Sequence, residues 1–274
     1  MNYKLCKIES RLIRYILYVA MFLLFCITLF MLNGVIEMKP VDLIISSFKE
    51  RGEYLHSTYI NGQKVDMYIV KSYYDYEKND ARTTFRKNEE GVYHIGSNLD
   101  IILTNRNPLR AEPMAIVQDF GNFFAKNFFI GHASINVNED GSEMIDAVGN
   151  SPEDNGVKIK LNDWISTEIS RSNDAQMIIG LRIKNLNNEK IEKVNSNLLE
   201  CEGLKYNYNL LISKKNSYYC TDLITRNLRK ENIEIDYDGL YPTGNDFIIS
   251  NNTFIIFICE RIEDKFNIYY MSEE

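Results

Sequence analysis

The sequence lacks the short signatures that mark several large enzyme classes. It has no G-x-S-x-G motif of serine hydrolases, no phosphate-binding loop and no H-E-x-x-H motif of zinc peptidases. Histidine is scarce, with three in 274 residues, and neither His56 nor His94 has the spacing from a cysteine that a zinc site requires. We therefore expect no metal catalysis, no metal ligands and no cofactor.

The chain also lacks a basic stripe of the kind that binds nucleic acid. Residues 1–33 hold four of the 31 basic residues and one of the 38 acidic residues, so the remainder carries a net charge of −10. The longest basic cluster in that remainder, TRNLRKENIEID, is diluted at once by acidic residues and is typical of the solvated face of a helix. We expect no nucleic-acid partner.

No repeat or low-complexity block interrupts the sequence. Hydrophobic residues make up 45% of the chain and charged residues 25%, which is typical of a folded protein. A chain of 274 residues can form one well-buried domain of about 150 to 200 residues with additional segments. One compact domain with an N-terminal appendage is the expected organisation.

The appendage contains an apolar run at residues 15–32, YILYVAMFLLFCITLFML, that is long enough to cross a bilayer as a helix. Four basic residues and one acidic residue precede it, and such a positive flank stays in the cytoplasm. The run is longer than that of a signal peptide, no A-x-A-like cleavage site follows, and no polar residue interrupts it as in a core helix. We expect a cytoplasmic segment at 1–14, an uncleaved transmembrane anchor at 15–33 and an extracytoplasmic remainder.

The number and position of the five cysteines limit which disulfides can form. Under this topology Cys6 is cytoplasmic and Cys26 lies in the membrane, which leaves Cys201, Cys220 and Cys259 outside. Three is an odd number, so in an oxidising compartment at most one disulfide forms and one thiol stays free. The sequence leaves open whether Cys201 and Cys259 are the pair.

After the anchor the pattern predicts a membrane-proximal region and linker at 34–91. Residues 41–55 have the pattern of a short amphipathic helix, and Asn61-Gly62 between strand-like runs predicts a hairpin. The polar stretch at 77–91 reads as a loop.

The remaining chain, 92–274, mixes strands and helices without a βαβ rhythm. This favours an α+β domain with a mainly antiparallel sheet. The expected strands are 98–104, 131–137, 142–148, 175–184 and 253–259, and the expected helices are 112–129, 161–170, 188–200 and the segment that follows Cys220.

The stretch GHASINVNEDGSEMIDAVG alternates polar and apolar residues and places His132 on the polar face of a strand. With a three-residue loop and Gly141 in the left-handed conformation, Ser134 pairs with Asp146, so Asp146 becomes a diagonal neighbour of His132. A two-residue turn would shift the register by one residue. Asp146 would then lie on the opposite face, and Glu143 would be the acid on the same face as His132. We prefer the first register, in which the aspartate can orient the imidazole.

Cys220 begins an amphipathic helix in the stretch NSYYCTDLITRNL. It lies one turn before Leu223, Ile224 and Leu228 on the same face and is therefore expected to point inward. Unpaired backbone N–H groups in the first turn favour a thiolate. A single inward cysteine, however, is far more often a core residue than a nucleophile.

Four ordered motifs change that balance: GSNLDIIL, GHASINV followed by MIDA, NGVKI, and KYNYNLL followed by SYYCTDLITRNL. Together, over about residues 93–255, they resemble the circularly permuted branch of the NlpC-type papain-like cysteine peptidases and amidases. The resemblance implies a papain-like domain in which Cys220 is the nucleophile, His132 the base and Asp146 the third polar member. The Cys220 backbone N–H would contribute to an oxyanion hole.

The chain departs from this pattern at three points. Asp146 stands where the family more commonly has glutamate, three residues separate Gly96 from Asp100, and CTD replaces CSE. The shorter Asp146 side chain must still reach the imidazole ring for the orienting contact to form.

These observations predict a membrane-anchored, outward-facing cysteine hydrolase that cleaves an amide or ester bond through a Cys220 thioester. A cell-wall peptide is the first expected substrate and a lipid acyl bond the second. The alternatives are an inactive module that binds cell-envelope fragments on the same fold, and an anchored scaffold protein in which Cys220 packs in the core. Trp164 and the many tyrosines could line a substrate groove, although core packing is the more common role for such residues.

Overall fold

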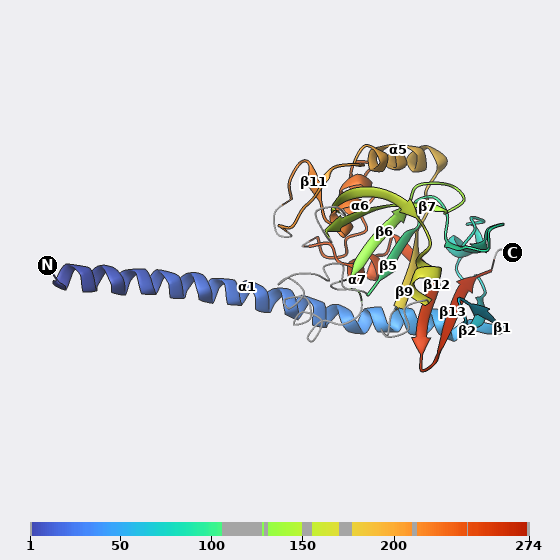
Figure 1. The fold of residues 1–274 in the computed structure, drawn as a ribbon, viewed down its shortest axis with the longest axis horizontal. Coiled ribbons are helices and arrows are strands. Elements are labelled where there is room, and N and C mark those ends of the chain that lie inside the picture. The colour runs from blue at the N-terminus through green and yellow to red at the C-terminus, as the bar shows by residue number, and fades with distance from the viewer. Residues whose placement is uncertain are drawn as a thin grey trace.

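The computed structural model describes residues 2–105, 128, 131–149, 155–169, 177–209, 213–239 and 241–272, with side chains from residue 11 onward. The described chain combines a long N-terminal helix with a mixed α+β domain built around one large sheet (Figure 1). Of the predicted elements, the helix at 112–129 lies outside the described residues, apart from Phe128.

Helix α1 runs without interruption from Asn2 to Glu50 and contains Pro40. The separate short helix expected at 41–55 is therefore wrong: its first ten residues continue α1, and strand β1 begins at Gly52. Proline lacks the N–H that would donate to the carbonyl four residues earlier, but packing against the domain can hold such a helix together. Val41, Ile45 and Phe48 supply that packing, because their helical spacing aligns them on one buried stripe.

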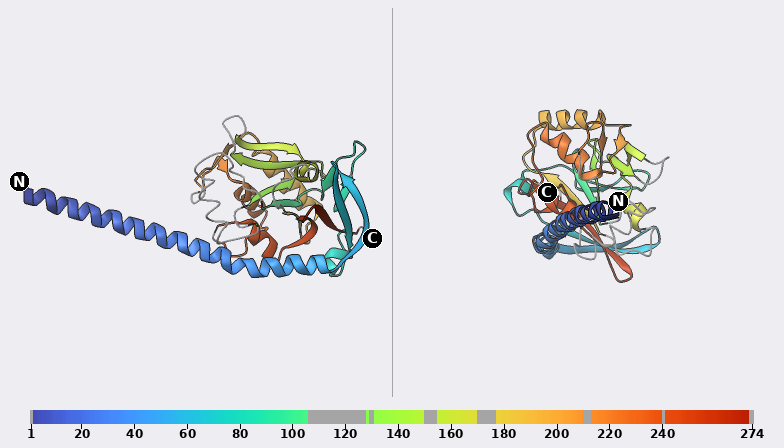
Figure 2. Two further views of the ribbon diagram at one scale, coloured as in Figure 1. Left: turned by 60° about the horizontal axis from the view of Figure 1, so that its bottom comes forward. Right: turned by 90° about the vertical axis from the view of Figure 1, so that its left-hand side faces the viewer.

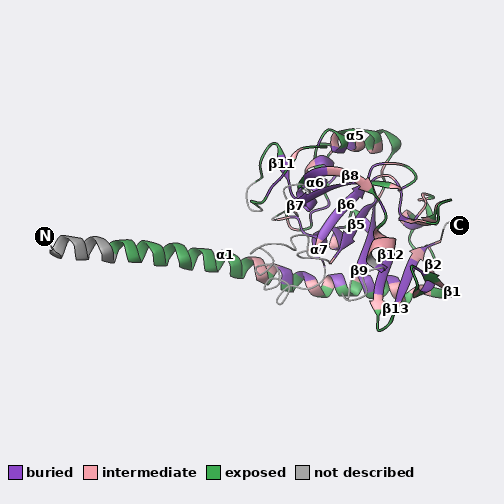
Figure 3. Cartoon of the chain, in the orientation of Figure 1, coloured by how far each residue is buried: buried purple, intermediate pink, exposed green. Residues whose placement is uncertain are grey.

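The two parts of α1 have different surroundings. The apolar side chains from Leu12 to Leu29 are exposed, whereas the part beyond residue 33 lies along the domain and packs on α7 (Gly244–Ile249) (Figures 2 and 3). Within the described chain, α1 is the one helix long and apolar enough to span a membrane. The orientation across the membrane stays a prediction.

The central sheet has nine strands, and every neighbouring pair is antiparallel except β13–β2, which is parallel. The predicted mainly antiparallel sheet is therefore confirmed. In spatial order the strands are β1 (Gly52–Ile60), β2 (Gln63–Val70), β13 (Lys265–Met271), β12 (Thr253–Ile262), β9 (Met177–Ile183), β5 (Ile101–Thr104), β6 (His132–Asn136), β7 (Glu143–Gly149) and β8 (Asn155–Leu161).

Strands β1 and β2 form the predicted hairpin. Ile60 pairs with Gln63, and the two turn residues between them have positive φ angles of 50° at Asn61 and 78° at Gly62. This combination is the type I′ turn that suits the twist of a two-residue hairpin. Because β2 pairs with β13, the segment 34–91 and the rest of the chain contribute to one sheet.

The stretch 77–91, expected to be a loop, instead contains regular structure. It includes the end of α2 (Asp75–Lys78) and all of β3 (Phe85–Lys87), which pairs with β4 (Tyr93–Ile95). A second small sheet pairs β10 (Lys205–Tyr206) with β11 (Ser217–Tyr218).

Three further described helices complete the domain: α4 (Trp164–Ile169), α5 (Asn188–Leu199) and α6 (Cys220–Arg229), all at predicted positions. Helix α6 packs on β6 and β7 through its apolar face, with Leu223, Ile224 and Leu228 buried. This contact brings the amino end of α6 to the two strands that carry the predicted histidine and aspartate.

Next to this layer lies a buried ion pair. The Arg182 guanidinium in β9 is only 1% exposed and lies 2.6 Å from Asp100 and 3.1 Å from Asp80. Its nitrogens also donate to the backbone oxygens of Arg82 and Thr83. Asp100, the aspartate of the first motif, is therefore held in a structural contact between β5 and β9.

Candidate active site

The β6–β7 hairpin sets the position of the histidine and the aspartate. Ser134 pairs with Asp146 and Asn136 with Met144, as the preferred register predicts, and Gly141 has a φ of +64°. The Val137 N–H donates to the Glu143 carbonyl at 3.0 Å and closes the loop. The alternative register, with Glu143 as the nearest acid, does not occur.

His132 and Asp146 are in direct contact. The His132 Nε2 atom lies 2.8 Å from the Asp146 Oδ1 atom, and both side chains are buried. Lys160 on β8 lies on the other side of the carboxylate, with Nζ 3.8 Å from Oδ2. The shorter aspartate side chain therefore reaches the imidazole.

Cys220 is the first residue of α6 and its side chain is 6% exposed. Tyr219 precedes it in an extended conformation, with φ −98° and ψ 172°, and its carbonyl accepts from the Leu223 N–H at 2.9 Å. The first N–H groups of a helix have no intrahelical acceptor, so the amide of Cys220 is of the type that can bind an anion. The thiol is thus held inward, at the positive end of the helix, as predicted.

The protonation of His132 is set by its two neighbours. Burial by itself lowers the pKa of His132, but the charge of Asp146, the hydrogen bond to it and the interaction with Cys220 outweigh burial and raise the pKa to about 10. Because Nε2 contacts the carboxylate, Nδ1 is the nitrogen left to interact with the thiol, and within the described chain Nδ1 has no hydrogen-bond partner. The structure therefore brings Cys220, His132 and Asp146 together.

Trp164 packs beside this group. Its ring centroid is 6.0 Å from that of His132, and its indole N–H points to Ser134 Oγ at 3.3 Å and Met144 Sδ at 3.0 Å. Trp164 therefore helps to fix the imidazole from the α4 side.

Three tyrosines lie near the thiol, and none of them was predicted as a site residue. Burial raises the pKa of Tyr206, Tyr219 and Tyr241, and the charge of Cys220 contributes in each case. The phenols are therefore neutral hydroxyl groups near Cys220, able to donate hydrogen bonds. Tyr219 and Tyr206 lie in the motifs SYYCTDLITRNL and KYNYNLL of the sequence, whereas Tyr241, 21 residues after Cys220, belongs to no such motif.

An aromatic path links this group to the apolar part of α1. The rings of Tyr219 and Tyr241 are stacked with centroids 5.0 Å apart, and Tyr241 meets the Phe30 ring edge-on at 5.8 Å. Phe30 belongs to the segment predicted to span the membrane. The candidate site therefore lies at the end of the domain from which the apolar helix projects.

Two other thiols, Cys201 and Cys259, are buried in structural surroundings. The four cysteines with described side chains, Cys26, Cys201, Cys220 and Cys259, are all free, so Cys201 and Cys259 do not pair with each other. Cys201 lies against Asn227 of α6, with Sγ 3.5 Å from Nδ2, and Cys259 is buried in β12.

Cys220, His132 and Asp146 together provide a thiol at the start of a helix, an imidazole that is protonated at neutral pH and a carboxylate that holds this imidazole. A protonated imidazole beside a thiol stabilises the thiolate, which is the nucleophilic form.

Comparisons with protein-family models, with curated proteins and with solved structures find no match for this chain.

Proposed function

We propose that this protein is a membrane-anchored, outward-facing cysteine hydrolase with a papain-like site of the permuted NlpC type. The observation that carries the proposal is the position of His132, which contacts Asp146 at 2.8 Å and interacts with Cys220 at the start of α6. A helix that carries the cysteine and packs on antiparallel strands that carry the histidine and the acid is the arrangement that the sequence resemblance implies.

In the first step the Cys220 thiolate attacks the carbonyl carbon of an amide or ester. The negative charge moves to the carbonyl oxygen, which accepts a hydrogen bond from the backbone N–H of Cys220. When the tetrahedral intermediate collapses, the His132 imidazolium gives its proton to the leaving amine or alcohol, and a thioester remains on Cys220.

In the second step water attacks the thioester. His132, now neutral, accepts a proton from the water, and the acid product leaves as the Cys220 thiolate re-forms. Asp146 keeps the imidazole in one orientation and stabilises its protonated form throughout. Trp164 holds the ring from the other side.

The substrate class follows from the location of the site. A cell-wall peptide is the first substrate expected from the sequence. The path from Phe30 through Tyr241 to Tyr219 favours a second class, lipids with an acyl amide or ester bond, because it connects the surroundings of the thiol to the predicted membrane segment. In both cases the bond cleaved lies near the membrane surface.

The test is hydrolysis by the full-length protein in detergent micelles, with peptidoglycan stem peptides and with acyl amides and esters of a lipid as separate substrates. We expect turnover by the wild type, none by Cys220→Ala, and normal turnover by Cys201→Ala, a buried thiol outside the site. Full activity of Cys220→Ala would refute the proposal. Saturable binding of these fragments without cleavage by the wild type would contradict it too, and would identify the inactive binding module instead.

A further inference from the structure

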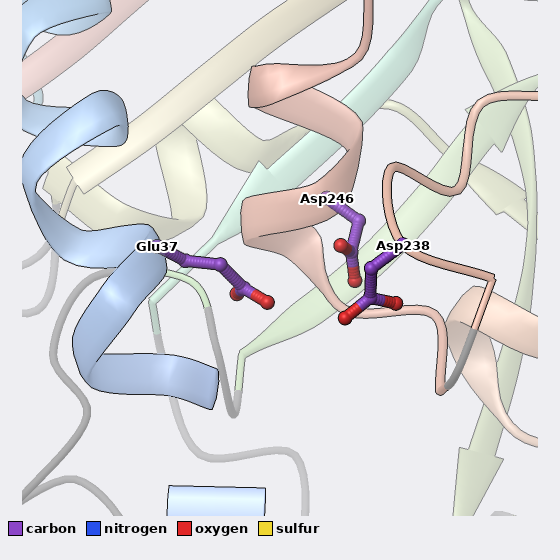
Figure 4. A group of neighbouring side chains, drawn as sticks. All are labelled: Glu37, Asp238 and Asp246. Atoms are coloured by element: carbon purple, nitrogen blue, oxygen red, sulfur yellow. The ribbon is translucent and has the colours of Figure 1, made fainter. Parts of the chain in front are cut away.

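A second group of polar side chains lies where the domain meets its anchor helix, away from His132 and Asp146. Glu37 comes from α1, Asp238 from the segment between α6 and α7, and Asp246 from the first turn of α7 (Figure 4). One carboxylate oxygen of each residue lies within 4.8 Å of one from both of the others. Three parts of the chain thus direct carboxyl groups at one point.

Two of these carboxylates are buried and incompletely bonded. Glu37 is 3% exposed and Asp246 is fully buried. Asn33 donates to Glu37 Oε1 at 2.6 Å, and Thr243 donates to Asp246 Oδ2 from its N–H at 2.8 Å and its hydroxyl at 2.7 Å. The second oxygens, Glu37 Oε2 and Asp246 Oδ1, have no hydrogen-bond partner, and Figure 4 shows both side chains directed toward Asp238.

A buried carboxylate oxygen without a partner is costly, and like charges nearby add to the cost. Burial, with repulsion from Asp246 and Asp238, raises the pKa of Glu37 to about 8; this residue lies beyond the apolar span. Burial and the charge of Asp238 likewise raise the pKa of Asp246 to about 7 against the effect of Thr243. Within the described chain no lysine or arginine forms an ion pair with Glu37 or Asp246, so no described cation would offset their charge when they ionise.

We propose that Glu37, Asp238 and Asp246 bind a divalent cation of the hard, oxygen-preferring class, with Ca²⁺ the best fit. Ca²⁺ holds oxygen ligands at about 2.3 to 2.6 Å, so two of its ligands can lie up to about 5 Å apart, which matches the separation of these carboxylates. Mg²⁺, with ligands at about 2.0 to 2.1 Å, demands a near-ideal octahedron and usually keeps several waters, which suits a site of three protein carboxylates less well. Glu37 Oε2 and Asp246 Oδ1 can become ligands while Asn33 and Thr243 keep their hydrogen bonds to the other two oxygens.

The ion would join the membrane anchor to the domain. Asp238 lies three residues before Tyr241, whose ring packs between Phe30 of α1 and Tyr219 beside Cys220. A cation at this point fixes the segment that carries Tyr241 against α1. This inference is independent of the proposed hydrolase activity, because it rests on side chains that the reaction does not use.

The experiment is direct binding of Ca²⁺, as CaCl₂, to the full-length protein in detergent after removal of metals by a chelator. Titration calorimetry and the melting temperature are measured, with MgCl₂ as the comparison ion. We expect one Ca²⁺ per chain, with an affinity in the range of about 10⁻⁴ to 10⁻³ M that is typical of extracellular modules, and a rise in melting temperature.

Three variants locate the site. Glu37→Gln and Asp238→Asn should each weaken binding at least about ten-fold, since each removes a charged ligand. Glu90→Gln, an exposed acid elsewhere in the chain, should leave binding unchanged. Asp238 is the least buried of the three ligands, so Asp238→Asn keeps the test valid even if Glu37→Gln does not fold.

Two results would overturn the proposal. One is the absence of saturable binding to the wild type up to about 10 mM Ca²⁺, ten times the weakest expected constant. The other is equal binding by the wild type and Asp238→Asn. If the wild type binds no Ca²⁺, a higher melting temperature for Glu37→Gln than for the wild type would show that the three carboxyl groups share protons with one another instead.

Discussion

Replacement of Asp146 by asparagine should change the protonation of His132 more than any other substitution near the site. The variant keeps the size of the side chain and removes its charge. In the wild type the pKa of His132 is raised from 6.5 to about 10, a difference that corresponds to about 5 kcal/mol in favour of the protonated ring. Burial opposes this shift, so without the carboxylate charge the pKa of His132 should fall below its ordinary value.

Stability should follow the same protonation. Because the folded pKa of His132 lies above the unfolded value, this residue contributes stability that is fully present below about pH 6.5 and is lost as the pH rises through about 10. Asp146→Asn should remove most of that dependence. Unfolding by urea at a series of pH values measures it, with Asp264→Asn, an exposed acid in the β12–β13 turn, as the matched control.

The assay for the ring itself is NMR titration of histidine-labelled protein, which has three imidazole signals to assign. We expect one histidine to remain protonated from about pH 5 to about pH 9 in the wild type and in Asp264→Asn, and to become neutral above about pH 6 in Asp146→Asn. A wild-type His132 that titrates near 6.5, or one indifferent to Asp146→Asn, would refute the reasoning.

Two further predictions concern the fold. Arg182→Met should lower the free energy of unfolding by about 3 to 5 kcal/mol, because it leaves the buried Asp100 carboxylate without its guanidinium. The control Arg86→Met removes one exposed hydrogen bond and should lower the free energy of unfolding by less than about 1 kcal/mol. Urea unfolding measures both, and equal costs would contradict the structural role of Arg182. Gly62→Ala should cost about 1 kcal/mol, since φ is positive but the new methyl meets no atom, while Gly141→Ala should cost about 2 kcal/mol more, because its methyl would press on the Gly96 carbonyl oxygen. Similar melting temperatures for these two variants would show that the β6–β7 loop can move aside.

The local features of the site could be read from the sequence because they depend on short-range rules. The alternation around His132 and the position of Gly141 determine the strand faces and the register, which the pairing of Ser134 with Asp146 confirms. The spacing of Leu223, Ile224 and Leu228 determines the inward face of α6, and with it the direction of Cys220.

Features that depend on long-range packing could not be predicted. The continuity of α1 through Pro40 results from burial of its last turns against the domain, which the helix pattern does not reveal. The parallel pairing of β13 with β2 joins strands about 200 residues apart. Likewise, no local pattern places Tyr241 beside Cys220, and the motif KYNYNLL does not by itself indicate that Tyr206 lies near the thiol.

The central claim is that Cys220 and His132 form a reactive pair, and alkylation by iodoacetamide tests it most directly. Full-length protein is labelled from about pH 5 to about pH 9, and each cysteine is followed by mass spectrometry, with the buried Cys201 and Cys259 as internal controls. We predict that at about pH 6, where an ordinary thiol is protonated, Cys220 reacts at least about ten-fold faster than both controls and slows in His132→Ala. A Cys220 as inert as Cys201 and Cys259, and indifferent to His132→Ala, would contradict the claim and mean that this thiol serves only to pack the core.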